Sequence, residues 1–222
     1  MKKRIGITQR VVYLADIDER RDVLDQRWYD FADAISVQLI PVPNNISSAA
    51  EYVASLKIGG IIFSGGNNIG ISGGELLSDK TIRKDDVALE RDQTEMHLLE
   101  WAINNQKPVV GVCRGFQFLN AFYGGSQSRV DPETHVATNH KVDIVEKEWE
   151  TTLGTSKNVN SYHNWGVLNH ELAGNLIPTA MCDNYVEGYQ HQTHSLFGIM
   201  WHHERYKEFR KQDINFFKQT FR

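Results

Sequence analysis

The sequence predicts an α/β fold with a mostly parallel central sheet, flanking helices and a small additional β region, formed by residues 1–222 as a single domain. Two observations lead to this prediction. Short apolar runs alternate with longer segments that have helical spacing of their apolar residues, as in parallel sheets covered by helices. The runs at 60–63 and 109–112 lack polar alternation, which is typical of strands buried on both faces.

The first half of the chain alternates between the two kinds of segment. Strands are expected at 5–8, 37–42 and 60–63, and helices at 28–34, 46–56 and 85–105. Pro41 and Pro43 end the second strand, and Ser47 or Ser48 is suited to cap the second helix. No element is assigned to the polar stretch 16–27, which is rich in Asp and Arg.

The second half begins in the same way and then changes character. Pro108 ends the long helix, a strand is expected at 109–112, and Gly124 and Gly125 close a helix at 116–122. Alternation at 141–145, followed by other short β-like runs, predicts the additional β region. An apolar strand at 195–201 precedes a helix at 206–221, whose aromatic residues have the spacing of a core-packing face.

Composition favours an ordinary globular protein in a reducing compartment. The net charge of −4, without a basic stripe, argues against nucleic-acid binding. No run approaches the ~18 apolar residues of a membrane span, and the apolar run after the basic N-terminus is too short for a signal peptide. Cys113 and Cys182 are too few for a disulfide framework. We therefore expect a cytoplasmic protein with a free thiol available for chemistry.

The most informative segment is 109–117, in which an apolar strand runs into Cys113 and then into a helix. Gly111 and Gly115 flank the cysteine at minus two and plus two, as in a nucleophile elbow with Cys in place of Ser. Such a turn strains the central residue and brings its neighbours close, so positions without Cβ are needed. It directs a helix N-terminus at the sulfur and leaves the N–H of Arg114 able to donate to an oxyanion. A buried structural cysteine is the alternative.

A second element follows the strand at 195–201. His202 and Glu204 are two residues apart, and on an extended segment such side chains point the same way. The carboxylate can then orient the imidazole, which leaves its other nitrogen for the sulfur, as in nucleophile–base–acid triads. Surface histidines beside an acid are one alternative. A metal site of His202, His203 and Glu204 is disfavoured because adjacent side chains diverge.

A third element, Ser64-Gly65-Gly66, follows the strand at 60–63. In open parallel sheets, ligand sites form beyond the carboxyl ends of the strands. This loop can bring a second backbone N–H beside Cys113, although an ordinary turn has the same local sequence.

Together these elements resemble the glutamine amidotransferase superfamily with a Cys-His-Glu triad, and within it the γ-glutamyl-γ-aminobutyrate hydrolase-like branch. The resemblance spans most of the chain and rests on the segments 64–66, 111–117, 159–163 and 201–204. It implies a flavodoxin-like fold and a hydrolase that acts on the γ-glutamyl amide bond of a small molecule, without a metal or other cofactor.

The same resemblance implies roles for individual residues. Cys113 is the nucleophile, His202 the base and Glu204 the orienting acid. Gly66 and Arg114 donate backbone N–H groups to the oxyanion. The segment 159–163 is similar to the one that holds the glutamyl end of the substrate. The implied glutamyl-binding residues are Gln117, Ser161, Tyr162 and His163.

Departures from the branch fall where the leaving group would lie. His163-Asn164-Trp165 stands in place of His-His-Gln, residues 67–70 lack the usual Asp, and His203 occupies a common Pro position. Overall likeness points to the γ-glutamyl-CDP-amidate hydrolases of bacterial capsular phosphoramidate synthesis, whose leaving group carries phosphates that need cationic partners. The candidates, each otherwise a solvated side chain, are Arg10, Arg20, Arg21, Arg27 and Arg129.

Three functions therefore compete. A free-standing γ-glutamyl hydrolase, acting on γ-glutamyl-CDP-amidate or on another γ-glutamyl amine, is favoured because no synthase domain occurs in the 222 residues. A glutaminase subunit that delivers ammonia to a separate synthase is the second. A non-enzymatic binding module of the same fold is the third, and the intact triad argues against it. A homodimer and a monomer both stay open.

Overall fold

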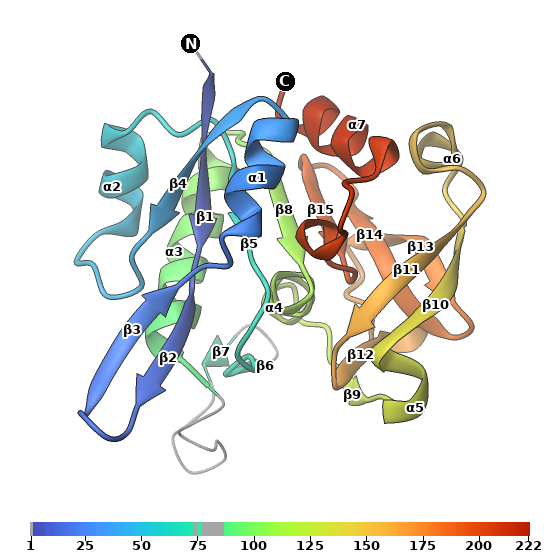
Figure 1. Cartoon of the computed structure of the whole chain (residues 1–222), viewed down its shortest axis with the longest axis horizontal. Helices are drawn as coiled ribbons and strands as arrows, with labels where there is room; N and C mark the ends of the chain where they lie inside the picture. Colours follow the sequence, from blue (N-terminus) through green and yellow to red (C-terminus); the bar gives the residue numbers. More distant parts are fainter. Residues whose placement is uncertain (1, 73–74, 77–86) are drawn as a thin grey trace.

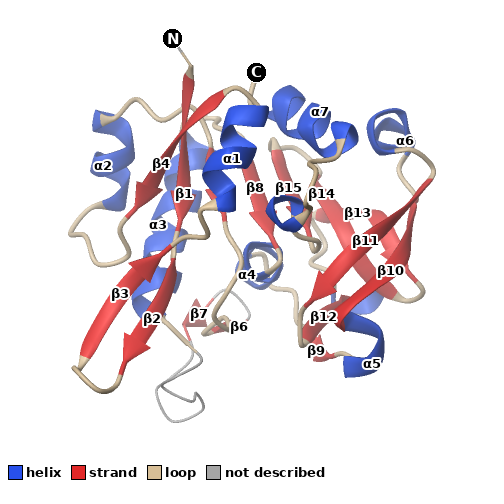
Figure 2. Ribbon diagram, in the orientation of Figure 1, coloured by secondary structure: helices blue, strands red, loops and turns tan. Residues whose placement is uncertain are grey.

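In a computed structural model, which describes residues 2–72, 75–76 and 87–222, one large sheet runs through the molecule with helices on both faces (Figures 1 and 2). Its strands are β1 (Lys3–Thr8), β4 (Val37–Val42), β5 (Ile61–Phe63), β8 (Val109–Val112), β10 (Val136–Ile144), β11 (Ser156–Tyr162), β13 (Leu176–Cys182), β14 (Tyr185–His191) and β15 (Leu196–Ile199), with β9 (Ser128–Arg129) and β12 (Trp165–Leu168) attached through β14. Two hairpins stand apart from the sheet: β2 (Arg10–Leu14) with β3 (Glu19–Val23), and β6 (Ile71–Ser72) with β7 (Glu75–Leu76).

The sheet has a parallel half and an antiparallel half. The strand order is β11-β10-β13-β14-β15-β8-β5-β1-β4. All pairs from β15 to β4 are parallel, whereas β11, β10, β13, β14 and β15 pair antiparallel. The predicted α/β fold with a parallel core is thus confirmed. The additional β region is not a separate layer, because its strands extend the same sheet (Figure 2).

Each face of the sheet packs against its own set of helices. The helices are α1 (Arg27–Ala34), α2 (Ala49–Ser55), α3 (Leu89–Asn104), α4 (Arg114–Phe122), α5 (Pro132–His135), α6 (Lys147–Leu153) and α7 (Lys211–Thr220), with 3₁₀ turns η2 (Asn169–Glu171) and η3 (His203–Arg205). One core joins α1, α6 and α7 to the sheet, and a second joins α2, α3 and α4 to its other face. Because both faces are covered, strands such as β5 and β8 are apolar throughout.

Several boundaries differ from the predicted ones. The polar stretch 16–27 contains β3, an exposed strand that pairs antiparallel with β2. The helix predicted from 46 begins at Ala49, because the Ser48 side chain accepts a hydrogen bond from the N–H of Glu51 and caps it. The helix predicted from 116 begins at Arg114, directly after Cys113. The long helix begins at Leu89, and residues 85 and 86 of its predicted range lie outside the described residues.

At the C-terminal end, the predicted strand 195–201 stops at Ile199, and the last helix begins at Lys211 rather than at residue 206. Among the helices in the described part of the chain, none combines the length and the apolar character needed to span a bilayer.

Candidate active site

Cys113 lies at the sharp turn between β8 and α4, with φ 52° and ψ −101°. This positive φ is strained for a residue with a Cβ. The flanking glycines make the turn possible, because a Cβ on Gly111 would lie 2.6 Å from the carbonyl of Gly115, and one on Gly115 would overlap the backbone of Phe63. The side chain is 8% exposed and forms no disulfide. The turn therefore presents a free sulfur at the N-terminus of α4, whose dipole favours negative charge there.

His202 and Glu204 meet beside this sulfur. Nδ1 of His202 lies 2.6 Å from Oε1 of Glu204, and both residues are buried. Burial alone would lower the pKa of His202, but the charges of Glu204 and Cys113 and hydrogen bonds with both side chains outweigh it and raise the pKa to about 10. Burial likewise opposes ionisation of Glu204, yet His202 holds the pKa of this carboxyl below its usual value. Glu204 therefore stabilises the protonated imidazole of His202 beside Cys113.

The local structure that brings these two residues together is not the predicted one. β15 ends at Ile199, and Glu204 lies on the 3₁₀ turn η3 rather than on an extended segment. Asn160 on β11 fixes the backbone of His202 from both sides, accepting from its N–H at 2.8 Å and donating to its carbonyl at 2.9 Å. His203 turns away to Asp213 at 3.2 Å. The backbone that carries the His202 imidazole is thus held by β11, a strand that does not pair with β15.

The loop Ser64-Gly65-Gly66 passes directly beside Cys113 and His202. A Cβ on Gly65 would lie 2.7 Å from Cε1 of His202 and 3.6 Å from Cβ of Cys113. Arg91, on α3, donates to the carbonyls of all three loop residues at 2.6, 3.1 and 3.0 Å. In a trans peptide the N–H points opposite to the preceding C=O. The clamp on the Gly65 carbonyl therefore turns the N–H of Gly66 away from Arg91.

The backbone and the side chain of Arg114, the residue after Cys113, have different surroundings. Its backbone N–H lies in the first turn of α4, where N–H groups have no partner within the helix. Its buried guanidinium pairs with Asp92 and Glu95 on α3, and Glu95 also binds Arg91 at 2.8 Å. One buried ion network therefore anchors both the cysteine turn and the 64–66 loop.

A cavity of about 510 Å³ opens above Cys113, a size suited to a small molecule. Its lining includes Cys113, His202, Gly66, Arg114, Gln117, Tyr162 and His163. Gln117 donates to the carbonyl of Trp165 at 2.9 Å, and the Tyr162 ring lies edge-on to that of His202. Ser161 is buried outside the lining and donates to the carbonyl of His135 at 2.6 Å. A larger hollow of about 1050 Å³ lies at the amino ends of β1 and β4, at the opposite edge of the sheet.

Four arginines line the cavity, and three of them, Arg10, Arg129 and Arg205, lie outside the buried ion network that holds the guanidinium of Arg114. Arg10 and Arg129 belong to the set named from the sequence, and Arg205 does not. Arg129 stacks over Trp165 and Arg205 over Tyr162, with 4.8 and 4.4 Å to the ring centroids. The other candidates are engaged elsewhere: Arg20 pairs with Glu90, Arg21 with Glu19, and Arg27 donates to backbone carbonyls of residues 204, 206 and 207.

Known proteins share this architecture. The sequence model of the Peptidase C26 family matches residues 5–204. The chain is 28% identical over 204 residues to a γ-glutamyl-CDP-amidate hydrolase of Campylobacter jejuni, with 90% of each chain covered. It is 23% identical over 179 residues to one subunit of the glutamine-hydrolysing GMP synthase of Methanococcus aeolicus, covering 76% of this chain and 79% of that one.

A crystal structure of a glutamine amidotransferase from Thermotoga maritima superposes with a TM-score of 0.64 at 14% identity, covering 99% of this chain and 84% of that one. This likeness shows a shared fold. Because the family match extends over nearly the whole described sheet and ends at Glu204, the chain belongs to the Peptidase C26 family of class I glutamine amidotransferase-like enzymes and is a cysteine-dependent hydrolase of γ-glutamyl amide bonds.

Proposed function

We propose that Cys113 attacks the γ-carbonyl of a γ-glutamyl amide, with His202 as its acid–base partner and Glu204 as the residue that orients the imidazole. The observation that carries this proposal is a buried His202–Glu204 pair whose imidazole lines the same cavity as the cysteine held at a strained turn. Attack forms a tetrahedral intermediate, and the imidazolium protonates the leaving nitrogen. A γ-glutamyl thioester stays on Cys113 until water, deprotonated by His202, releases glutamate.

The oxyanion of the tetrahedral intermediate would accept hydrogen bonds from the backbone N–H groups of Gly66 and Arg114. Two features support this assignment. The helix start of α4 leaves the N–H of Arg114 without a partner inside the helix, and the Arg91 clamp fixes the peptide before Gly66. Losing one such donor typically costs about 10²–10³ in rate.

The glutamyl end of the substrate would lie against Gln117, Tyr162 and His163, which line the cavity. Ser161, implied as a fourth contact by family resemblance, hydrogen-bonds to a backbone carbonyl and is buried. A role for Ser161 would therefore be to hold the segment between His135 and Tyr162 in place rather than to touch the substrate.

For the leaving group we propose the cytidine-diphosphate amidate of γ-glutamyl-CDP-amidate. Arg10, Arg129 and Arg205 place three cationic side chains around one small cavity, and guanidinium groups bind phosphate oxygens well. A leaving group without phosphate, such as γ-aminobutyrate, gives these side chains less to bind. The likeness to the Campylobacter jejuni enzyme over 90% of both chains agrees with this choice. On this proposal the product serves capsular phosphoramidate synthesis.

A glutaminase subunit that delivers ammonia to a separate synthase is the second candidate. The likeness to the Methanococcus aeolicus GMP synthase subunit, over 76% of this chain, favours it. The two functions differ in substrate, because a glutaminase releases ammonia from plain glutamine and responds to its synthase.

Glutamate release from γ-glutamyl-CDP-amidate, γ-glutamyl-γ-aminobutyrate and glutamine, with Cys113→Ala as the control, separates these possibilities. The proposal expects kcat/KM to be highest for γ-glutamyl-CDP-amidate and no release by the control. Equal, slow turnover of all three compounds would contradict the substrate assignment. Release that persists in Cys113→Ala would contradict the nucleophile.

A further inference from the structure

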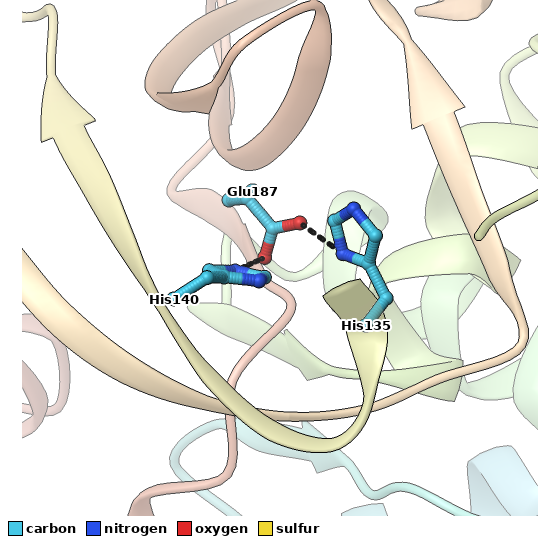
Figure 3. A group of neighbouring side chains, drawn as sticks. All are labelled: His135, His140 and Glu187. Carbon is cyan, nitrogen blue, oxygen red and sulfur yellow. Dashed lines mark ion pairs between the residues drawn. The ribbon is translucent and has the colours of Figure 1, made fainter. Parts of the chain in front are cut away.

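A second cluster of chemically active side chains lies outside the Cys-His-Glu site. His135 at the end of α5, His140 on β10 and Glu187 on β14 converge, with one ligand atom of each within 4.8 Å of the others. Figure 3 shows the two carboxylate oxygens of Glu187 facing one imidazole each, at 3.9 Å for His135 and 3.4 Å for His140. None of these residues was singled out in the sequence, because they are separated along the chain and no motif joins them.

His163 is the fourth side chain of this cluster, and its ring faces the same carboxylate. Its Nε2 lies 3.6 Å from Oε1 of Glu187, and its ring centroid is 5.0 Å from that of His135. Nδ1 of His163 lies 3.0 Å from the carbonyl of Trp165. A carbonyl can only accept, so Nδ1 carries the proton and the lone pair of a neutral ring is on Nε2, toward Glu187. Histidines that ligate metals typically donate their second nitrogen in this way.

The cluster is buried. Glu187 is 1% exposed and His135 and His163 are each 3% exposed, so the charge of the carboxylate is costly without a cation. All of the ion-pair partners recorded for Glu187 in the described part of the chain are histidines.

From this geometry we propose that His135, His140, His163 and Glu187 bind one Zn²⁺ ion. Zinc in proteins takes four N, O or S ligands at about 2.0–2.1 Å in a tetrahedron, which places neighbouring donors about 3.3–3.5 Å apart. The imidazole nitrogens lie 3.4 Å from Oε2 of Glu187 and 3.6 and 3.9 Å from its Oε1, and the ligand atoms of His135, His140 and Glu187 lie within 4.8 Å of one another, so zinc binding would draw these side chains closer together. Three imidazoles with one carboxylate are also a donor set that zinc accepts. This proposal departs from the sequence-based expectation that the chain holds no metal.

The ion would link β10 and β14 to the segment that follows β11. That segment carries Tyr162, His163 and Trp165, which line the cavity above Cys113. With all four positions taken by protein, the site has the closed coordination of structural zinc. The ion would hold one wall of the cavity in place. Loss of the ion should therefore lower the stability of the fold more than the rate of catalysis.

Zinc content and Co²⁺ binding test the proposal directly. The Cys113→Ala chain is used throughout, because the thiolate and His202 could themselves bind a soft metal. The untagged protein, stripped with EDTA and dialysed, is titrated with Zn²⁺ and with Co²⁺. We expect about one Zn²⁺ per chain by mass spectrometry, a Co²⁺ spectrum typical of tetrahedral N/O ligands, and a lower Tm in the stripped form.

Glu187→Gln and His135→Gln should abolish saturable binding, whereas His97→Gln, on an exposed position of α3, should bind like the parent chain. No saturable binding by the parent chain, an octahedral Co²⁺ spectrum, or unchanged binding by Glu187→Gln would each overturn the proposal. Circular dichroism shows whether Glu187→Gln is folded. If it is not, the test rests on the titration of the parent chain and on His140→Gln, which changes the most exposed ligand and should also abolish saturable binding.

Discussion

His202 and Glu204 form a buried ion pair, with Nδ1 and Oε1 separated by 2.6 Å and each side chain 3% exposed. A pair held this far from water is electrostatically strong, and it costs free energy when only one partner is removed. It sets both the charge of His202 and the direction in which its other nitrogen faces Cys113.

Replacing Glu204 with Gln should reduce kcat by about 10²–10⁴ with a smaller change in KM, because the imidazole loses the charge that orients it and stabilises its protonated form. Steady-state kinetics on the best substrate measures this. Glu208→Gln, on an exposed position close in sequence, is the matched control and should retain wild-type kcat. A Glu204→Gln enzyme as fast as the control would show that the pair has no catalytic role.

The same pair predicts a pH dependence of stability. The pKa of His202 is raised in the folded protein from 6.5 to about 10, so its contribution is fully present below about 6.5 and is lost as the pH rises through about 10. The free energy of unfolding in urea should therefore fall across this range. In Glu204→Gln the fall attributable to His202 should be smaller, because its folded pKa is no longer raised as far. Parallel pH profiles for the two proteins would contradict this linkage.

Gly65→Ala should lower the catalytic rate more than it affects folding. The new Cβ would lie 2.7 Å from Cε1 of His202, and displacing the imidazole by about 1 Å can cost about 10² in rate. We expect a loss of this order in kcat with a folded protein by circular dichroism. Gly174→Ala is the control, since no atom lies within 4 Å of its new Cβ. Wild-type turnover in Gly65→Ala would place the loop farther from the reacting atoms than proposed.

Arg91→Lys tests the clamp on the 64–66 loop. Lysine keeps the charge but cannot supply the guanidinium fork that reaches three successive carbonyls. Buried acceptors left without a donor cost about 1–3 kcal/mol each, so we expect lower stability in urea and a lower kcat. Arg20→Lys, which alters a partly exposed pair with Glu90, should change stability by less than about 0.5 kcal/mol. Full activity in Arg91→Lys would remove the positioning role.

The arginine side chains that line the cavity predict that removing one of them lowers kcat/KM more for a substrate with phosphates than for one without. Arg129→Gln should lower kcat/KM for γ-glutamyl-CDP-amidate by about 10–100-fold, the loss of one hydrogen bond to a charged group, and should change kcat/KM for γ-glutamyl-γ-aminobutyrate far less. Arg21→Gln, whose partner Glu19 lies on the outer hairpin strand β3, should affect neither. An equal loss on both substrates would argue against phosphate binding by Arg129.

Local sequence patterns were sufficient to predict the parallel core and the turn at Cys113. The apolar runs of β5 and β8 and the two glycines of the turn have direct steric causes, so they can be read without knowing distant contacts. The β2–β3 hairpin was missed because its second strand is fully exposed, and exposed strands show no apolar alternation.

Residues whose contacts join distant parts of the chain could not be predicted from the sequence. Arg91 contacts the 64–66 loop from 25 residues or more away, and Asn160 reaches His202 across 42 residues. Buried polar residues in helices and strands resemble surface ones until the packing is known. Arg205, next to the proposed triad in sequence, carried a local signal that was overlooked.

The central claim is that one sulfur attacks the γ-carbonyl and carries the glutamyl group. Rapid acid quench during turnover of γ-glutamyl-CDP-amidate, followed by intact-protein and peptide mass spectrometry, tests it most directly. We predict an adduct of one glutamyl residue on Cys113 that hydroxylamine removes, and no adduct in Cys113→Ala. Glutamate release without any adduct on Cys113, or with an adduct at Cys182, would contradict the account.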